Sequence, residues 1–172
     1  MTWTPNKRMA AIALGILALD QITKQLVVHY LEWNGLGVVV FDGFFKLVHW
    51  GNTGAAWSMF SGQNAMLAII SLLALLGLFI WRHHFDCKTV PGQISLGLIF
   101  GGIAGNLIDR LFIGHVVDFI RFYIYTRSGQ EAGFPAFNVA DSAICVGVGL
   151  LFIQSWRAET QKTEQETPAA TK

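Results

Sequence analysis

Four long apolar segments constrain the fold of this 172-residue chain more than any other feature. They cover about residues 9–31, 65–81, 93–112 and 139–156, and each is long enough to cross the hydrocarbon core of a bilayer as a helix. Hydrophobic residues make up 53% of the chain and charged residues only 13%, an unusual balance for a soluble domain. The sequence therefore predicts an all-α membrane protein built around a bundle of four transmembrane helices.

The first apolar segment has an alternative interpretation as a cleaved secretory signal, because Lys7 and Arg8 precede a short hydrophobic run. No small-x-small cleavage site follows this run, and hydrophobic residues resume after Asp20 and Lys24 and continue to Trp33. We therefore expect an uncleaved first transmembrane helix.

Asp20 and Lys24 lie four residues apart, so they share one face of this helix and can neutralise each other. Burying even a paired couple gains little stability. A structural or orienting role is therefore favoured for the pair, while a direct catalytic role stays open.

The link between the first two helices has the pattern of a small β-hairpin. Residues 38–41 and 44–50 are rich in β-branched and aromatic side chains, and an Asp-Gly pair separates them. We expect this hairpin at the membrane surface. Asn52 and Gly54 follow it and either present amide and backbone donors to a ligand or form an ordinary turn before a helix.

The third apolar segment carries Gly97, Gly101 and Gly105 at every fourth position. This spacing leaves a smooth groove along one helix face, which predicts close packing against another helix.

The end of the third segment is polar and contains Asn106, Asp109 and Arg110. Asn106 and Arg110 share a helix face. Arg110 can bind a carboxylate, a substrate carbonyl or a phosphate, or it can form an interfacial anchor with Asp109.

Two further segments do not span the membrane. Residues 113–136 form a long link that contains Asp118, and its Gly- and Pro-containing stretch at 129–135 predicts a mobile loop that acts as a lid. Residues 158–172 are polar and lack aromatic side chains, which predicts a disordered tail. The sequence thus predicts one membrane domain over residues 1–157.

The distribution of basic residues predicts the orientation of the bundle. Seven lie in the N-terminus, the middle link and the tail, and three lie in the other two links: Lys7, Arg8, Arg82, Lys88, Arg157, Lys162 and Lys172 against Lys46, Arg121 and Arg127. We expect both termini in the cytoplasm and the hairpin on the outer side.

Several function classes receive no support from the sequence. The net charge is +1 and the basic residues are scattered, so we expect no nucleic-acid partner. Cys87 and Cys145 fall at different predicted depths, so we expect no disulfide bond. The adjacent His83 and His84 lack a second ligand cluster, so we expect no metal and no cofactor.

Asp118 and Asp141 are the candidate chemical centre. Asp118 lies between apolar residues after the third helix, and Asp141 lies in the first turn of the fourth, so the two carboxyl groups should meet near the outer surface. An acid at membrane depth is costly and usually functional. Two carboxyl groups at close range share a proton, which makes one an acid and the other a base. Such a pair activates water against an amide, as in aspartic peptidases.

Five blocks of residues occur in a fixed order along the chain: Asp20-x-x-x-Lys24, Asn52-Thr53-Gly54-Ala55-Ala56, Gly105-Asn106-Leu107-Ile108-Asp109-Arg110, Val116-Val117-Asp118-Phe119 and Phe137-Asn138-Val139-Ala140-Asp141. Together with four apolar spans, these blocks closely resemble the signature of bacterial lipoprotein signal peptidase (signal peptidase II). Trp57 departs from the pattern, because phenylalanine is expected there.

The resemblance implies an aspartyl endopeptidase of the bacterial inner membrane with its active site near the periplasmic face. It implies that diacylglyceryl-modified prolipoproteins are the substrates, cut before the lipidated cysteine, and that membrane lipids and globomycin-type peptide inhibitors are further partners. It implies a catalytic dyad of Asp118 and Asp141. It also implies substrate-binding roles for Asn52, Gly54, Asn106, Arg110 and Asn138, and supporting roles for Asp20, Lys24 and Asp109.

Two alternatives from other classes stay open. The buried charges also fit a small ion-coupled transporter or proton-conducting subunit. A third reading is an assembly subunit whose polar residues only join helices. Proteolysis by the purified protein distinguishes both of these from a peptidase.

Overall fold

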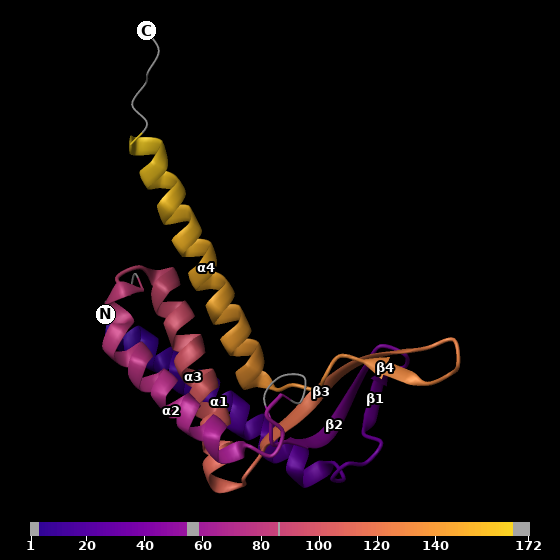
Figure 1. Ribbon diagram of the computed structural model, residues 1–172. Coiled ribbons are helices and arrows are strands. Elements are labelled where there is room, and N and C mark those ends of the chain that lie inside the picture. Colours follow the sequence, from indigo (N-terminus) through magenta and orange to yellow (C-terminus); the bar gives the residue numbers. More distant parts are fainter. Residues whose placement is uncertain (1–3, 55–58, 86, 167–172) are drawn as a thin grey trace.

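The computed structural model describes residues 4–54, 59–85 and 87–166 and shows a helical bundle with a small sheet at one end (Figure 1). The elements in chain order are α1 (Pro5–Tyr30), β1 (Val38–Phe41), β2 (Phe45–Asn52), α2 (Asn64–Trp81), the short 3-10 helix η2 (Arg82–His84), α3 (Val90–Phe112), β3 (Val116–Tyr125), β4 (Glu131–Gly133) and α4 (Val139–Glu166). The four predicted transmembrane helices are confirmed as helices long and apolar enough to cross a membrane.

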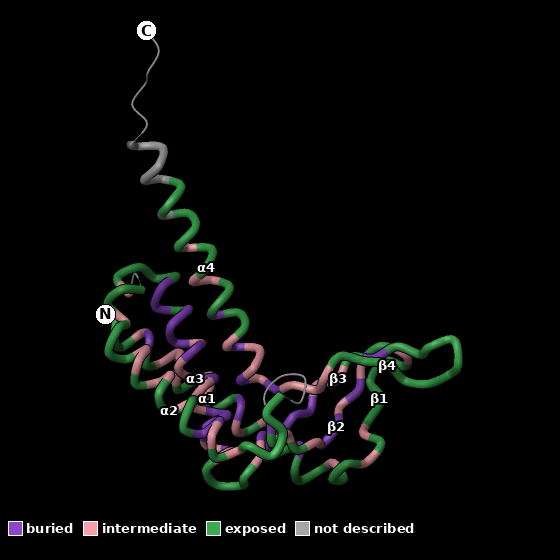
Figure 2. Tube along the Cα trace, viewed as in Figure 1, coloured by how far each residue is buried: buried purple, intermediate pink, exposed green. Residues whose placement is uncertain are grey.

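Helix α3 forms the centre of the bundle. In its most apolar window 56% of the residues are buried within the protein, compared with 11–17% for the other three helices. Figure 2 shows this difference as a buried α3 beside largely exposed neighbours. The outer helices present leucine, isoleucine and phenylalanine side chains outward, as helices surrounded by lipid do. The interior of the helical bundle therefore lies along α3.

Two helices begin a few residues earlier than the hydrophobic pattern predicts, because capping residues extend them. The Thr4 hydroxyl accepts a hydrogen bond from the Lys7 N–H at 3.4 Å, and Pro5 occupies the first helical position of α1. The Thr89 hydroxyl likewise accepts from the Gly92 N–H at 3.2 Å at the start of α3. Polar caps of this kind lie outside an apolar window.

The predicted glycine groove on α3 is confirmed, and helix α1 occupies it. A methyl group on Gly97 would lie 2.8 Å from the Cβ of Ile12, and one on Gly101 would lie 2.6 Å from the carbonyl oxygen of Ala13. Both distances are shorter than real side chains tolerate. The absence of side chains here lets the two helix backbones approach closely.

We expect Gly101→Ala to lower the thermal unfolding temperature in detergent, because the added methyl group forces α1 and α3 apart. Overpacking of this kind costs about 1–3 kcal/mol. Gly149→Ala is the matched control, because a methyl group there meets nothing within 4 Å and alanine favours a helix more than glycine does. Tryptophan fluorescence during heating measures the unfolding temperature of each variant. Equal unfolding temperatures for the two variants would contradict this packing.

The sheet has the order β1-β2-β3-β4, and all neighbouring strands are antiparallel. The predicted hairpin is confirmed in β1 and β2. Gly43 at its turn has φ +68°, a backbone conformation that glycine adopts without strain.

The prediction of a loop over residues 113–136 is wrong for most of its length. β3 pairs with β2 along six residue positions, and β4 pairs with β3 at its far end. The β-branched and aromatic residues of 116–125 favour a strand, but only the distant β2 supplies its hydrogen-bonding edge. Asp118 therefore lies on a strand, opposite Trp50, and not on a lid.

The prediction of disorder from residue 158 is also wrong as far as the described chain extends. Helix α4 continues to Glu166, well beyond its apolar segment. The extension is rich in glutamate, glutamine and lysine, which prolong a helix that has already formed. Residues 167–172 of the predicted tail lie outside the described residues, as do Ala55, Ala56 and Trp57.

Candidate active site

Asp141 is fixed at the start of α4 by a reciprocal pair of hydrogen bonds with Asn138. The Asp141 N–H donates to Asn138 Oδ1 at 2.9 Å, and the Asn138 N–H donates to Asp141 Oδ2 at 3.3 Å. This is the geometry of a capping box, which satisfies backbone donors that a helix start leaves open. The positive end of the helix dipole also favours a carboxylate at this place.

Asp118 is buried on β3, with 3% of its surface exposed, and both of its oxygens accept hydrogen bonds. Asn52 Nδ2 donates to Oδ2 at 3.0 Å, and Asn138 Nδ2 donates to Oδ1 at 2.9 Å. Asn52 comes from the end of β2, so strand pairing brings this donor to Asp118.

Asn138 connects the two aspartates, because it bonds the side chains of both. It is fully buried at the turn between the sheet and α4. The predicted meeting of Asp118 and Asp141 is therefore seen in the structure.

Burial, and after it the charge of Asp141, raises the pKa of Asp118 from 3.8 to about 7. Hydrogen bonds from Asn52 and Asn138 and the charge of Lys24 oppose this rise. Asp118 is therefore able to hold a proton near neutral pH.

Asn106 donates to the other aspartate. Its Nδ2 lies 2.7 Å from Asp141 Oδ1, and its Oδ1 accepts from Asn138 Nδ2 at 3.2 Å and from Lys24 Nζ at 2.9 Å. The polar end of α3 is thus joined to both aspartates through amide side chains.

The predicted ion pair of Asp20 and Lys24 is present at 2.8 Å, and both residues are buried. Asp109 also pairs with Lys24, again at 2.8 Å. The alternative of an interfacial Asp109–Arg110 anchor is not what the structure shows. Arg110 instead donates to the backbone oxygens of Gly54 at 3.0 Å and Asn106 at 3.4 Å.

A cavity of about 830 Å³ lies beside these groups. Its polar wall includes five of the predicted site residues: Asn52, Gly54, Asn106, Arg110 and Asp141. Its apolar wall includes residues from the bundle and from the segment before α4: Ile103, Ile144, Val146, Phe134 and Phe137. The cavity therefore has the polar and apolar surfaces that a peptide with an apolar portion needs.

The other predicted site residues stand behind the cavity wall. Asp20, Lys24, Asp109, Asn138 and Asp118 are buried and do not line the cavity. Asp118 is one hydrogen bond behind the lining residue Asn52.

Sequence reasoning missed several residues that line the cavity: Trp50, Phe134, Phe137 and Ser142. The aromatic residues around Pro135 were the available signal, but a local pattern does not show which cavity they face.

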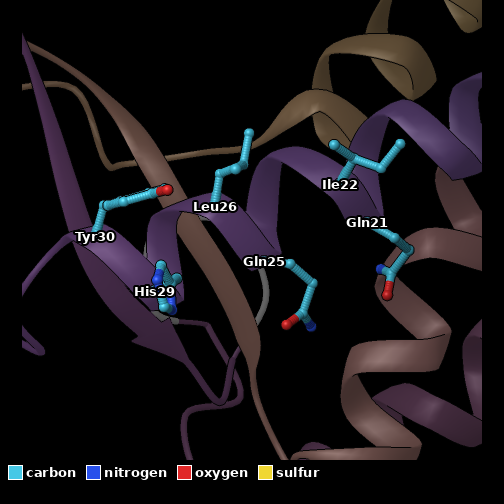
Figure 3. A pocket seen from close by; sticks show the side chains of 6 residues that line it. All are labelled: Gln21, Ile22, Gln25, Leu26, His29 and Tyr30. Carbon is cyan, nitrogen blue, oxygen red and sulfur yellow. The ribbon is translucent and has the colours of Figure 1, made fainter.

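A second, shallower groove of about 500 Å³ runs along α1 and is lined by residues of that helix alone: Gln21, Ile22, Gln25, Leu26, His29 and Tyr30. Figure 3 shows these side chains spread along the helix, with Gln21 nearest to the neighbouring helix. Neither aspartate of the candidate site lines it. Among residues 4–54, 59–85 and 87–166, no group of three or more histidine, cysteine, aspartate or glutamate side chains is placed to hold a metal ion.

Comparisons with known proteins agree with this architecture. A chain solved at 2.3 Å and described as a bacterial membrane enzyme superposes with a TM-score of 0.75 and 30% identity, covering 95% of this chain and 94% of its own. A second, solved at 1.9 Å, gives a TM-score of 0.70 and 32% identity, covering 85% and 90%.

Two bacterial relatives are each named lipoprotein signal peptidase. The protein of Anoxybacillus flavithermus is 36% identical over 162 residues, covering 94% of this chain and 93% of its own length. That of Bacillus subtilis is 37% identical over 155 residues, covering 90% and 97%. Residues 12–157 match the sequence profile of the family described as signal peptidase (SPase) II. The chain therefore belongs to the signal peptidase II family.

Proposed function

We propose that this protein is an aspartyl endopeptidase that removes signal peptides from diacylglyceryl-modified prolipoproteins and cuts before the lipidated cysteine. The family and the names of the relatives support the reaction class. The single structural observation that carries the proposal is the pair of aspartates joined by Asn138, with Asp141 in the polar wall of a cavity and Asp118 buried directly behind that wall.

The proposed chemistry uses one protonated and one ionised carboxyl group. A proton shared between Asp118 and Asp141 leaves one carboxylate to deprotonate a water molecule, which then attacks the scissile carbonyl carbon. The protonated carboxyl group gives its proton to the carbonyl oxygen, which forms a tetrahedral gem-diol. The other carboxyl group, which has taken a proton from the water, gives it to the departing nitrogen as the C–N bond breaks. The gem-diol hydroxyl returns its proton to the first carboxylate, which restores the singly protonated pair. The raised pKa of Asp118 supports its role as the group that carries the proton near neutral pH.

Polar groups in the cavity wall are available to bind the peptide backbone. The Arg110 Nε–H is buried and has no hydrogen-bond partner among the described residues. A buried donor without a partner is costly, so a substrate carbonyl that accepts from it gains affinity. Asn52, Gly54 and Asn106 line the same wall and complete the proposed backbone-binding set.

The apolar wall of the cavity supports the choice of a lipid-modified substrate. Ile103 lies on the central helix α3, whereas Ile144 and Val146 lie on α4, whose surface is largely exposed on the outside of the bundle. Acyl chains can therefore stay in lipid beside α4 while the peptide enters between helices. Membrane lipids are then direct neighbours, and a globomycin-type cyclic peptide would compete for the same cavity.

We propose the inner membrane as the location, with both termini in the cytoplasm and the aspartates near the periplasmic face. The arrangement in Figure 1 supports this, because the sheet lies at the end of the bundle opposite the start of α1 and the end of α4. The excess of basic residues in the termini and the middle link supports the same orientation.

The test is incubation of the purified protein with two forms of one precursor, with and without the diacylglyceryl group. We expect cleavage before the modified cysteine in the lipidated form and at least a tenfold lower kcat/KM for the unmodified form. Failure to cleave either form would contradict the proposal. Ion flux into proteoliposomes without cleavage would instead support the transporter alternative.

A further inference from the structure

Lys24 is the most completely enclosed cation of the described chain, with 2% of its surface exposed. Its Nζ lies 2.8 Å from Asp20 Oδ2, 2.8 Å from Asp109 Oδ2 and 2.9 Å from Asn106 Oδ1. An ammonium group has three N–H donors, so these three acceptors use all of them. Lys24 does not line the cavity, and its three donors are all used by protein groups.

The two carboxylate partners of Lys24 each hold the backbone next to one aspartate of the candidate site. Asp20 Oδ1 accepts from the Ala140 N–H at 2.9 Å, and Ala140 directly precedes Asp141. Asp109 Oδ2 accepts from the Val117 N–H at 3.1 Å, and Val117 directly precedes Asp118. The same lysine thus stabilises the two carboxylates that fix both backbone segments.

The third partner of Lys24 is the side-chain amide of Asn106, and Lys24 helps to set which end of that amide faces Asp141. Lys24 can only donate, so it requires the oxygen of the Asn106 amide on its side. The amide nitrogen then faces Asp141 and donates to it at 2.7 Å. Without Lys24 the orientation of the amide is held only by the longer bond from Asn138 Nδ2, at 3.2 Å, and by the Asp141 carboxylate.

We propose that Lys24 is a positioning residue for the peptidase reaction, which sets the geometry of both aspartates through Asp20, Asp109 and Asn106. This inference rests on the proposed function. The competing explanation is that Lys24 only neutralises two buried carboxylates and thereby keeps the protein folded. The two explanations differ in what happens when the lysine is removed without changing the net charge of the cluster.

The test is the double variant Lys24→Met/Asp20→Asn, which removes one positive and one negative charge together. The asparagine at position 20 retains an oxygen that can accept from the Ala140 N–H. We expect a folded protein whose kcat falls at least tenfold while KM changes less than threefold, because only the reacting groups lose their alignment. The assay is steady-state cleavage of the lipidated precursor in detergent.

Lys46→Met/Glu131→Gln is the matched control. Lys46 is also buried and pairs with Glu131 at 2.6 Å, but this pair lies on the sheet and contacts neither aspartate. We expect its kcat to stay within twofold of the unmodified protein. A wild-type kcat in a folded Lys24→Met/Asp20→Asn variant would overturn the positioning role.

Asp109→Asn is a second variant in case the double variant does not fold. It keeps Lys24 and an oxygen for the Val117 N–H but weakens the ion pair, and we expect at least a threefold lower kcat at unchanged KM. Unchanged kcat in this variant would overturn the inference.

An activity-independent readout separates this inference from the proposed function. The infrared C=O band of the protonated carboxyl group, assigned by its loss in Asp118→Asn, should shift in the Lys24 double variant and not in the Lys46 control. If the unmodified protein does not cleave the precursor, the proposed function fails, and this band still decides the role of Lys24. An unshifted band would overturn it.

Discussion

Asp118→Asn and Asp141→Asn are each expected to abolish cleavage of the lipidated precursor while the protein stays folded and binds its substrate. An amide cannot exchange a proton with water or with the leaving nitrogen, so either change removes the shared proton. Loss of general acid–base catalysis typically costs about 10²–10⁴-fold in rate, and here both functions belong to one pair. Single-turnover cleavage assays and binding of a labelled precursor measure the two effects separately.

Asp42→Asn provides the matched control for these two variants. Asp42 is an exposed carboxylate at the hairpin turn, where it accepts from the hydroxyl groups of Tyr123 and Tyr125. It lies on the same sheet as Asp118 but bonds neither aspartate, so kcat should remain within twofold of the unmodified protein. Cleavage at the wild-type rate by Asp118→Asn or Asp141→Asn would end the proposed mechanism.

The helices and the meeting of the two aspartates could be predicted from the sequence, because each depends on a local signal. An apolar run of membrane length has few alternatives to a helix. A carboxylate at the edge of such a run is costly and needs a partner, which identified Asp118 and Asp141 before any geometry was known. The glycines at every fourth position similarly identified the face of α3 that packs against α1.

Two errors, the loop at 116–125 and the Asp109–Arg110 anchor, come from contacts between distant parts of the chain. Residues 116–125 become a strand because β2, more than 60 residues earlier, offers an edge to pair with. The partner of Asp109 is Lys24, 85 positions away, and not its neighbour Arg110. No spacing in the sequence indicates either contact.

The structure separates the predicted site residues into those that line the cavity and those that lie behind its wall, a distinction that the sequence does not show. Asn52, Asn106 and Arg110 line the cavity, whereas Asn138 and Lys24 lie behind it. Substitutions in the first set should therefore change KM and kcat together, and substitutions in the second set should mainly change kcat.

The rate of cleavage should fall as the pH rises above about 7, because Asp118 then loses its proton and both carboxyl groups are ionised. Burial is the main cause of the raised pKa, and the charge of Asp141 adds to it. Once the proton is mostly lost, kcat should decrease about tenfold per pH unit, with an apparent midpoint that belongs to the pair. Measurement of kcat from pH 5 to pH 9 tests this decrease.

The raised pKa of Asp118 also predicts how the stability of the folded protein depends on pH. The folded pKa of about 7 lies above the ordinary value of 3.8, so the folded protein binds more protons at Asp118 than the unfolded chain between these pH values. The unfolding free energy contributed by this group is therefore greatest below that window and decreases as the pH rises through it. Asp118→Asn removes this contribution. The unfolding temperature of the unmodified protein should therefore fall relative to that of the variant between pH 4 and pH 7. A constant difference across that window would show that Asp118 keeps an ordinary pKa, and the pH limb of the cleavage rate would then need another titrating group.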